Sequence, residues 1–213
     1  MENVKLLASS ESPYCQSVKG QLLAQGVPHV TEILSWRALQ GNAAVRALNP
    51  KGQVPILVHA GGALCDSLFI TVHLHGPQWL ASPDALIFRT AEVELRDAMN
   101  AIYMGAQDAS HAQPLAGTCA LLCLLLERCH EDERGPAASP SAVLERSVPV
   151  ATPGILHAAF LLNATLGLLE KRGLAVPSET SHLASILSEV PLVERVLLDF
   201  GARNHFLPTG GAS

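Results

Sequence analysis

Two residue pairs in the first third of the chain have the chemistry to hold a short acidic peptide. Val54–Pro55 stands at the mouth of a short apolar strand, where a proline gives up a ladder hydrogen bond. We predict that the bond between them is cis, an isomer almost confined to proline. The N–H and C=O of Val54 then turn outward and can pair with an extended peptide. Asp66–Ser67 precede a helix, whose first turn offers free N–H groups and a positive dipole end to a carboxylate. Together these pairs predict a socket for such a peptide.

The tetrapeptide S-P-Y-C at 12–15 has the chemistry to activate a thiol. It lies where a predicted strand, 4–8, meets a helix that begins with a serine before a proline. A thiol bound beside Ser12 would be stabilised as the nucleophilic thiolate by the helix dipole and by the hydroxyl donor. A simple helix cap also explains Ser12 and is compatible with that role. Ser9 and Ser10 are the competing donors.

The run A-L-N-P-K-G-Q-V-P-I-L at 47–57, followed by L-C-D-S-L-F-I at 64–70, resembles the glutathione-binding half of the glutathione S-transferase superfamily. The resemblance implies a thioredoxin-like first domain. In it, the backbone of Val54, before Pro55, pairs with the cysteinyl part of glutathione, and Asp66–Ser67 hold the γ-glutamyl end. For the glycyl carboxylate, the family usually supplies a cation or polar group from this region. The residues available here are Trp36, Arg37, Gln40, Lys51 and Gln53.

Among these, Gln53 is best placed by its spacing, whereas Arg37 and Lys51 more often serve as solvated surface charges. The tetrapeptide at 12–15 also resembles the C-P-Y-C motif of glutaredoxins, with Ser12 replacing the first cysteine. In serine-type transferases of the tau, theta and zeta classes, a serine there activates glutathione. The resemblance therefore implies conjugation or glutathione-assisted isomerisation rather than thiol–disulfide exchange.

Cys15, one turn into the same helix, takes the second cysteine position of glutaredoxins. It is either a buried structural thiol or a redox-active one, and only a lowered pKa and solvent access would make it reactive. A glutathione-dependent thiol reductase working through Cys15 therefore stays an alternative function.

Composition narrows the class of protein. The 213 residues carry 14 Lys and Arg against 19 Asp and Glu, a net charge of −5 that argues against nucleic acid as a partner. The chain opens without a basic n-region or long apolar h-region, and its most apolar stretch, 118–126, is too short to cross a bilayer. Five unevenly placed cysteines do not form a disulfide framework. We expect a soluble cytoplasmic protein.

The order of elements predicts an α/β domain followed by an all-α domain. Strands are expected at 4–8, 29–34, 55–59 and 63–65, and helices at 13–24, 43–48 and 66–74, with a loop at 35–42. This is a thioredoxin-like layout over 1–76. Helices alone are expected over 83–213, at 84–106, 115–130, 154–171, 180–189 and 193–200. The whole corresponds to the glutathione S-transferase fold that the resemblance implies.

Several residues of the second domain allow two interpretations. Cys119, Cys123 and Cys129–His130 have the spacing of a metal cluster, but among leucines free cysteines are better explained as small hydrophobes, so we expect no metal. The segment 131–153 is either a tolerated surface insertion or a flap over the active site. An apolar pocket for the electrophile can be lined by Met99, Tyr103, Met104 and His111, although such a stripe is usually core.

Transferases of the superfamily usually open the buried helix of this domain with the capping box Ser/Thr-x-x-Asp. Here Pro153 is followed by Gly154 and, three residues later, His157, so the box is absent. Thr152 can cap the helix instead, or His157 can hydrogen-bond locally. His157 is either a catalytic base or, as is commoner for a lone histidine on an apolar helix, a satisfied core residue.

The sequence thus predicts a homodimeric glutathione transferase. It would activate glutathione, its cofactor, for attack on a hydrophobic electrophile in detoxification or specialised metabolism. The rival from another class is a non-catalytic binding or scaffold module that keeps the socket but has lost the chemistry. The missing capping box and the unusual segment 131–153 favour this interpretation.

Overall fold

A computed structural model describes residues 4–39, 41–104, 112–134 and 151–206 of the chain. Contacts between Cα atoms divide the chain into two compact units. The first comprises Met1–Leu80 and Leu192–Asn204, and the second Ala81–Pro191 and His205–Ser213. The segment 192–204, which the sequence pattern places in the helical domain, groups by these contacts with the first unit.

The first unit is built on a four-stranded mixed sheet in the order β2-β1-β3-β4. The strands are β1 (Val4–Ala8), β2 (His29–Ile33), β3 (Ile56–His59) and β4 (Gly62–Cys65). β1 is parallel to β2 and antiparallel to β3, and β3 is antiparallel to β4. This arrangement confirms the thioredoxin-like fold.

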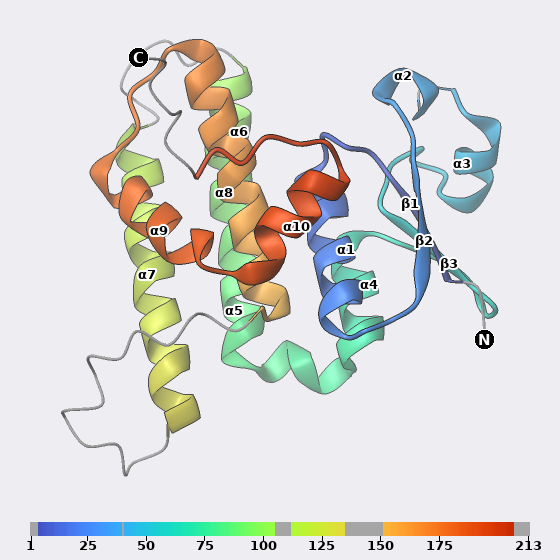
Figure 1. Ribbon diagram of the computed structural model, residues 1–213, viewed down its shortest axis with the longest axis horizontal. Helices are drawn as coiled ribbons and strands as arrows, with labels where there is room; N and C mark the ends of the chain where they lie inside the picture. The colour runs from blue at the N-terminus through green and yellow to red at the C-terminus, as the bar shows by residue number, and fades with distance from the viewer. Residues whose placement is uncertain (1–3, 40, 105–111, 135–150, 207–213) are drawn as a thin grey trace. The chain divides into compact units, whose positions relative to one another are not determined.

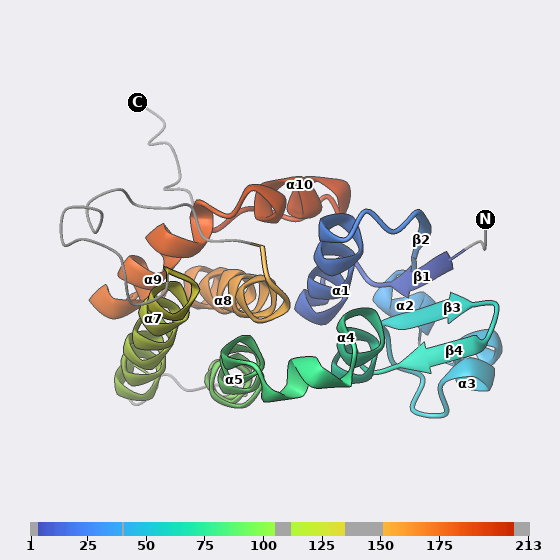
Figure 2. The same ribbon diagram turned by 90° about the horizontal axis from the view of Figure 1, so that it is seen from below.

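Helices cover both faces of this sheet (Figures 1 and 2). α1 (Pro13–Ala24) and α4 (Ser67–His75) pack side by side on one face, and α2 (Trp36–Leu39) and α3 (Ala43–Leu48) lie on the other. The 3₁₀ turn η1 (Pro77–Ala81) follows α4. On the α2–α3 face, a core cluster consists of Leu7, Leu39, Val45 and Ile56.

The expected loop at 35–42 is wrong in part, because it contains α2. The side-chain oxygen of Ser35 accepts a hydrogen bond from the N–H of Ala38 at 3.2 Å, which caps the short helix. Leu39, at its last residue, is buried in the core cluster. Tertiary burial of one leucine thus selects a helical turn that a poorly patterned sequence does not reveal.

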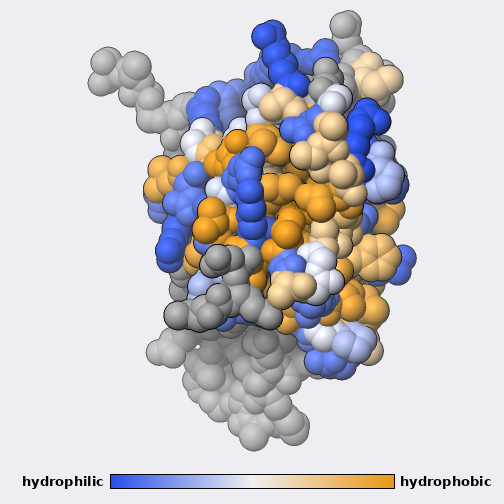
Figure 3. Space-filling view, turned by 90° about the vertical axis from the view of Figure 1, so that its right-hand side faces the viewer, coloured by the Kyte–Doolittle hydropathy of each residue, from blue (hydrophilic) through white to orange (hydrophobic). Residues whose placement is uncertain are grey.

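The helices leave part of the sheet exposed. Figure 3 views the molecule from the side on which Figure 1 places the sheet with α2 and α3, and hydrophobic side chains gather there between polar ones. Val30 and Ile33 of the edge strand β2 are exposed. An ion pair between Lys5 of β1 and Glu32 of β2 adds charge to this surface, a common way of protecting an edge strand from unwanted pairing.

The final helix, α10 (Pro191–Asp199), is attached to the first unit through α1. Lys19 of α1 is nearly buried, and its Nζ lies 2.9 Å from Oδ2 of Asp199. The same ammonium lies 5.3 Å from the ring centroid of Phe200, within the range of a cation–π interaction.

Helices and no strand make up the regular structure of the second unit over its described residues. α5 (Pro83–Thr90) continues through the π-helical turn η2 (Ala91–Leu95) into α6 (Arg96–Tyr103), followed by α7 (Ala112–Arg134), α8 (Pro153–Arg172) and α9 (Ser178–Ser188). The continuous helix expected at 84–106 is therefore interrupted by a π turn. By length and composition α8 alone, among the described helices, qualifies as a membrane span, but 78% of its apolar window is buried, as in a core helix.

Candidate functional site

Strand register brings the three predicted site segments of the first unit to one edge of the sheet. Leu7 of β1 pairs with Ile56 of β3, which pairs with Cys65 of β4. β1 and β4 end at this row and β3 begins there, because β3 runs antiparallel to both. The loop 9–12 follows β1, Val54–Pro55 precede β3, and Asp66–Ser67 follow β4, so each segment lies within a few residues of the same cross-strand row.

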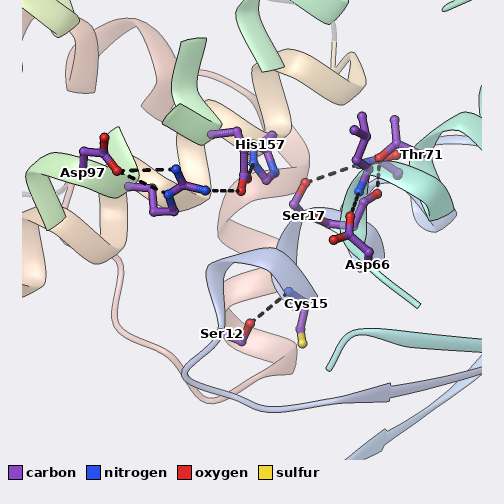
Figure 4. A network of polar contacts seen from close by, with 12 residues as sticks. Ser12, Cys15, Ser17, Asp66, Thr71, Asp97 and His157 are labelled. Atoms are coloured by element: carbon purple, nitrogen blue, oxygen red, sulfur yellow. Dashed lines mark hydrogen bonds and ion pairs between the residues drawn. The ribbon is translucent and has the colours of Figure 1, made fainter. Parts of the chain in front are cut away.

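The first segment is a closed turn that leads into α1. The N–H of Ser12 donates to the carbonyl oxygen of Ser9 at 3.2 Å. Ser12 has extended backbone angles, and its Oγ accepts the N–H of Cys15 at 3.3 Å, with Pro13 at the first helical position (Figure 4). The predicted helix cap is confirmed. A serine hydroxyl that accepts one hydrogen bond can still donate its own proton to a bound group.

Cys15 lies beneath this turn and is fully buried. Its Sγ accepts the N–H of Ser9 at 3.4 Å. Burial raises the pKa of the thiol from 9.0 to about 11, against the smaller opposing effects of hydrogen bonds from Ser12 and Ser9. At neutral pH only about one molecule in ten thousand would carry a thiolate. Cys15 therefore has the environment of the structural thiol, the first of its two sequence interpretations.

The third segment caps α4. Oδ1 of Asp66 accepts the N–H of Leu68 at 2.9 Å, and the Asp66 side chain is exposed. Asp66 has φ 79° and ψ 131°, a backbone region that residues other than glycine rarely adopt. Ser67 is buried, and its carbonyl oxygen accepts the hydroxyl of Thr71 at 2.8 Å (Figure 4). The first turn of α4 thus presents its N-terminal end beside an exposed carboxylate.

The α1–α4 side of this segment is polar and buried. Ser17 and Gln21 of α1 are both inaccessible to solvent, and Nε2 of Gln21 donates to Oγ of Ser17 at 3.3 Å. Figure 4 shows Ser17 in the same view as Asp66 and Thr71. This bond lies within α1, and Oε1 of Gln21 is buried without a hydrogen-bond partner among the described residues.

The peptide bond Val54–Pro55 is cis, as predicted. The loop before it is braced by Asn49, a buried residue that the sequence analysis does not single out. Its Nδ2 donates to the carbonyl oxygen of Gln53 at 2.8 Å, and its Oδ1 accepts the N–H of Lys51 at 3.1 Å. The N-P-K-G run was the available signal, since an asparagine before a tight turn often bonds to its own loop.

The residues predicted to meet the glycyl carboxylate come from this loop and from the segment 36–40. Gln53 and Lys51 are exposed on the loop, and Arg37 is exposed on α2. The side chain of Trp36 and the whole of Gln40 lie outside the described residues. The side chains of Gln53, Lys51 and Arg37 are therefore accessible to a ligand that binds from solvent.

The predicted electrophile-binding residues are less well defined. Met99 of α6 is half-buried, and Met104, just after α6, is strongly exposed. The side chain of Tyr103, His111 and most of the predicted flap at 131–153 lie outside the described residues, although α7 continues to Arg134.

His157 of α8 is fully buried and satisfied within the second unit. Its ring stacks on Phe88 with centroids 3.8 Å apart and an interplanar angle of 14°. Its Nε2 lies 2.8 Å from Oε2 of Glu92, on the π turn η2. Arg96 contacts both Glu92 and Asp97 at 3.4 Å, which extends the chain of polar contacts to the surface (Figure 4). This environment is that of a core histidine.

The start of α8 is capped by a residue from another helix. Thr152 Oγ1 accepts the N–H of Ile155 at 3.4 Å and donates to the carboxylate of Asp84 in α5. Both carboxylate oxygens of Asp84 also accept the N–H of Gly154, at 3.0 and 2.9 Å. Asp84, distant in sequence, thus supplies the carboxylate that the local capping box lacks.

Over the described residues, no three His, Cys, Asp or Glu side chains gather as metal ligands. Cys119 and Cys123 are buried in the second unit, and the thiol of Cys119 donates to Oγ1 of Thr180 at 3.5 Å. Burial is the main cause that raises the pKa of Cys119 to about 11. The side chains of Cys129 and His130 lie outside the described part of the chain.

Comparison with known proteins finds a family match within the first unit. Residues 11–75 match the family described as glutathione S-transferase, N-terminal domain. No curated protein matches the chain. Among solved structures, yeast Ure2p in complex with glutathione is similar, with 16% identity, a TM-score of 0.62 and coverage of 92% of this chain and 94% of that one.

Two further similar structures are transferases. An omega-class glutathione transferase 3C of Trametes versicolor has 19% identity and a TM-score of 0.58, covering 91% of this chain and 88% of that one. A tau-class glutathione S-transferase of mango has 15% identity and a TM-score of 0.56, covering 97% and 93%. At these identities the likeness shows the fold.

Proposed function

We propose that this chain, which has the glutathione S-transferase fold and carries the N-terminal domain of that family over residues 11–75, binds glutathione and activates its thiol for attack on an electrophile. Asp66–Ser67 would hold the γ-glutamyl end, with the carboxylate of Asp66 meeting its ammonium and the first turn of α4 meeting its carboxylate. The backbone of Val54 would pair with the cysteinyl residue. Gln53 would meet the glycyl carboxylate, together with Lys51 of the same loop and Arg37 of α2.

The observation that carries this proposal is the convergence of the three segments on the row Leu7–Ile56–Cys65. An extended tripeptide needs a donor and acceptor backbone at its middle and charged partners at its ends. At this edge of the sheet, Val54 and the N-terminal ends of α4 and α1 would supply these groups. That yeast Ure2p, which shares the fold, was solved with glutathione supports the same ligand here.

Ser12 is the proposed activating residue. Its hydroxyl stands at the first turn of α1, where the helix dipole favours an anion, and would donate a hydrogen bond to the glutathione sulfur. The thiol proton would leave to solvent, and a sulfur lone pair would form the new C–S bond. An activated ring would then release its leaving group, whereas an unsaturated carbonyl compound would take up a proton. Ser9, buried with its N–H bonded to Cys15, is a less accessible donor.

The structure weakens the support for both alternatives. A thiol reductase would need Cys15 as an accessible thiolate, but Cys15 is buried and its pKa is raised to about 11. One of the two observations that favour the non-catalytic module is the missing capping box, and Asp84 and Thr152 cap α8 without that box. The electrophile would be an apolar molecule in contact with Met99 and Met104. His157 is not assigned as a catalytic base, because such a base must reach its substrate and His157 is fully buried.

Titration calorimetry with glutathione tests the proposal. We expect wild-type protein to bind with a dissociation constant of about 1 mM or tighter. Asp66→Ala should weaken binding at least about tenfold, because it leaves the glutathione ammonium without its partner. Asp97→Ala, which removes an exposed carboxylate of the second unit, is the matched control and should bind as wild type does.

Ser12→Ala should separate activation from binding. We expect it to retain most of the affinity but to raise the thiol pKa of bound glutathione by about one to two units, because a hydrogen bond to a charged group is worth about 1.5–3 kcal/mol. Absence of binding to the wild-type protein, by calorimetry and by a second method, would refute the glutathione assignment.

A further inference from the structure

Two buried side chains of α1 hold the loop 9–12 from behind. The Sγ of Cys15 accepts the N–H of Ser9 at 3.4 Å, and Nε2 of Gln16 donates to the carbonyl oxygen of Ser10 at 2.9 Å. Cys15 is 0% exposed and Gln16 is 5% exposed. Consecutive residues of one helix therefore bind two consecutive residues of the loop, one through an acceptor and the other through a donor.

The remaining bonds of the loop complete a closed arrangement. Ser12 N–H donates to the carbonyl oxygen of Ser9 at 3.2 Å, Cys15 N–H donates to Oγ of Ser12 at 3.3 Å, and Gln16 N–H donates to the carbonyl oxygen of Ser12 at 3.1 Å. The backbone of Ser12 is thereby fixed on both sides. Only rotation of its hydroxyl proton is left to adapt to a ligand.

The chemistry of Cys15 suits a fixed acceptor and not a nucleophile. A thiol that stays protonated at neutral pH carries no charge to attract a bound sulfur or a disulfide, and its burial prevents contact with either. A sulfur atom is still a weak acceptor for a backbone N–H. Cys15 and Gln16 each make a hydrogen bond to the same loop. Neither the reductase interpretation of Cys15 nor a plain packing role accounts for these two bonds together.

We propose that Cys15 and Gln16 are positioning residues for Ser12. They hold the loop 9–12 so that the Ser12 hydroxyl stays at the N-terminal end of α1, where the glutathione sulfur would lie, and neither residue touches glutathione. The inference rests on the proposed function, since it names the residues that set the geometry of the same site. A displacement of about 1 Å at a reacting group can cost about 100-fold in rate, so two bonds behind the loop have a measurable effect on the thiol.

Four variants separate this role from simple packing. Cys15→Ala removes the acceptor for the Ser9 N–H, whereas Cys15→Ser restores an acceptor in a smaller side chain. Gln16→Glu keeps the size of Gln16 but places a carboxylate against the carbonyl oxygen of Ser10. Cys119→Ala is the matched control, because Cys119 is also 0% exposed, hydrogen-bonded and held at a pKa of about 11, but belongs to the second unit.

The measurement is the pH titration of the thiolate absorbance of bound glutathione, together with its dissociation constant and with kcat on a generic electrophile. We expect Cys15→Ala and Gln16→Glu to change the dissociation constant less than about threefold, to raise the thiol pKa by about half a unit to one unit, and to lower kcat about three- to tenfold. Cys15→Ser should recover part of both effects. Cys119→Ala should lower thermal stability and leave the thiol pKa unchanged.

Loss of stability without a change in thiol pKa in both Cys15→Ala and Gln16→Glu would overturn the inference and leave the proposed function intact. A wild-type protein that binds no glutathione, or that leaves the bound thiol pKa at its free value, would instead overturn the proposed function and the inference with it. If Cys15→Ala does not fold, Gln16→Glu carries the test, since it alters one side-chain bond at nearly constant volume.

Discussion

At the scale of single residues, Asp66 shows a conflict between backbone and side chain. Its angles of φ 79° and ψ 131° suit glycine, and holding another residue there costs about 1–3 kcal/mol. The chain nevertheless carries an aspartate, whose Oδ1 caps Leu68 and whose side chain is exposed at the sheet edge. A local cost of this kind is expected at a binding site and not in a purely structural turn.

Substitution of Asp66 should therefore separate stability from binding. We expect Asp66→Gly to raise the free energy of unfolding by about 1 kcal/mol, since relief of the backbone exceeds the loss of the cap and the entropy of glycine. Glutathione binding should fall at least about tenfold. Asp66→Asn, which keeps the cap and the backbone cost, should lose binding without gaining stability. Urea unfolding and calorimetry give both quantities, and a less stable Asp66→Gly protein would contradict the argument.

Cys15 gives the protein a predictable alkaline limit. Burial raises its pKa from 9.0 to about 11, so the folded chain keeps a proton that the unfolded chain releases. The contribution of the protonated Cys15 thiol to the free energy of unfolding is complete below about pH 9 and is lost as the pH rises towards 11. It amounts to about 2–3 kcal/mol for Cys15.

Urea unfolding under reducing conditions at pH 8 and at about pH 10.5 measures this loss. Cys15→Ser has no thiol to titrate and should lose less stability over the same interval than the wild type, whereas Cys65→Ser, at a half-buried site, should behave nearly as wild type does. Equal losses in wild type and Cys15→Ser would show that other groups determine the alkaline limit.

At the scale of elements, α8 depends on α5 for its first turn. Asp84 binds the Gly154 N–H and the Thr152 hydroxyl, and a Cβ added at Gly154 would overlap the backbone oxygen of Asp84. Glycine is therefore needed for the close approach of the two helices, although it is a poor helix residue elsewhere. A local capping box and this contact between α5 and α8 are two ways of supplying hydrogen-bond acceptors to the N–H groups at the start of a helix.

We expect Gly154→Ala and Asp84→Ala each to lower the free energy of unfolding by about 2 kcal/mol or more, through the clash and through loss of the cap respectively. Gly117→Ala is the control. Gly117 is exposed on α7, and a Cβ added there would meet no atom within 4 Å, so this change should raise stability by about 0.5–1 kcal/mol. Differential scanning calorimetry measures all three. A neutral Gly154→Ala would show that α5 can move away at no cost.

Local signals predict local elements well in this chain. Ser12 with Pro13 predicts the start of α1, Val54–Pro55 predicts the cis bond, and the ends of most helices agree with the sequence to within a few residues. The features that were missed depend on distant partners. α2 forms because Leu39 enters a core cluster, and the cap of α8 comes from Asp84, 68 residues before Thr152.

At the scale of the whole molecule, the sequence order of elements does not fix their grouping. A run of helices after residue 83 predicts one helical domain to the C-terminus, yet 192–204 belongs with the first unit. The Lys19–Asp199 ion pair and the ring of Phe200 explain this grouping. A lysine in the middle of α1 has no periodic signature that would announce a partner 180 residues away.

We propose that the predicted homodimer is formed through apolar side chains that each unit leaves in solvent. Phe69, two residues after Ser67 on α4, is 66% exposed in the first unit. In the second unit, Leu86 of α5 and Val93 of η2 are 53% and 41% exposed. Large exposed apolar residues on helices, an aromatic one above all, are typical anchors of a protein interface. We expect α4 and α5 to form the contact between two copies of the chain.

Sedimentation equilibrium tests this contact. Wild-type protein should be a dimer, and Phe69→Glu should be a monomer, because burying an unpaired carboxylate at the interface costs several kcal/mol. Leu198→Glu is the matched control, since Leu198 is 71% exposed in the same unit, on α10, and should leave the dimer intact. The Phe69→Glu monomer should still bind glutathione, because its proposed partners Val54, Asp66 and Ser67 all lie within one copy. A dimer that survives Phe69→Glu but dissociates with Leu198→Glu would move the interface from α4 to α10.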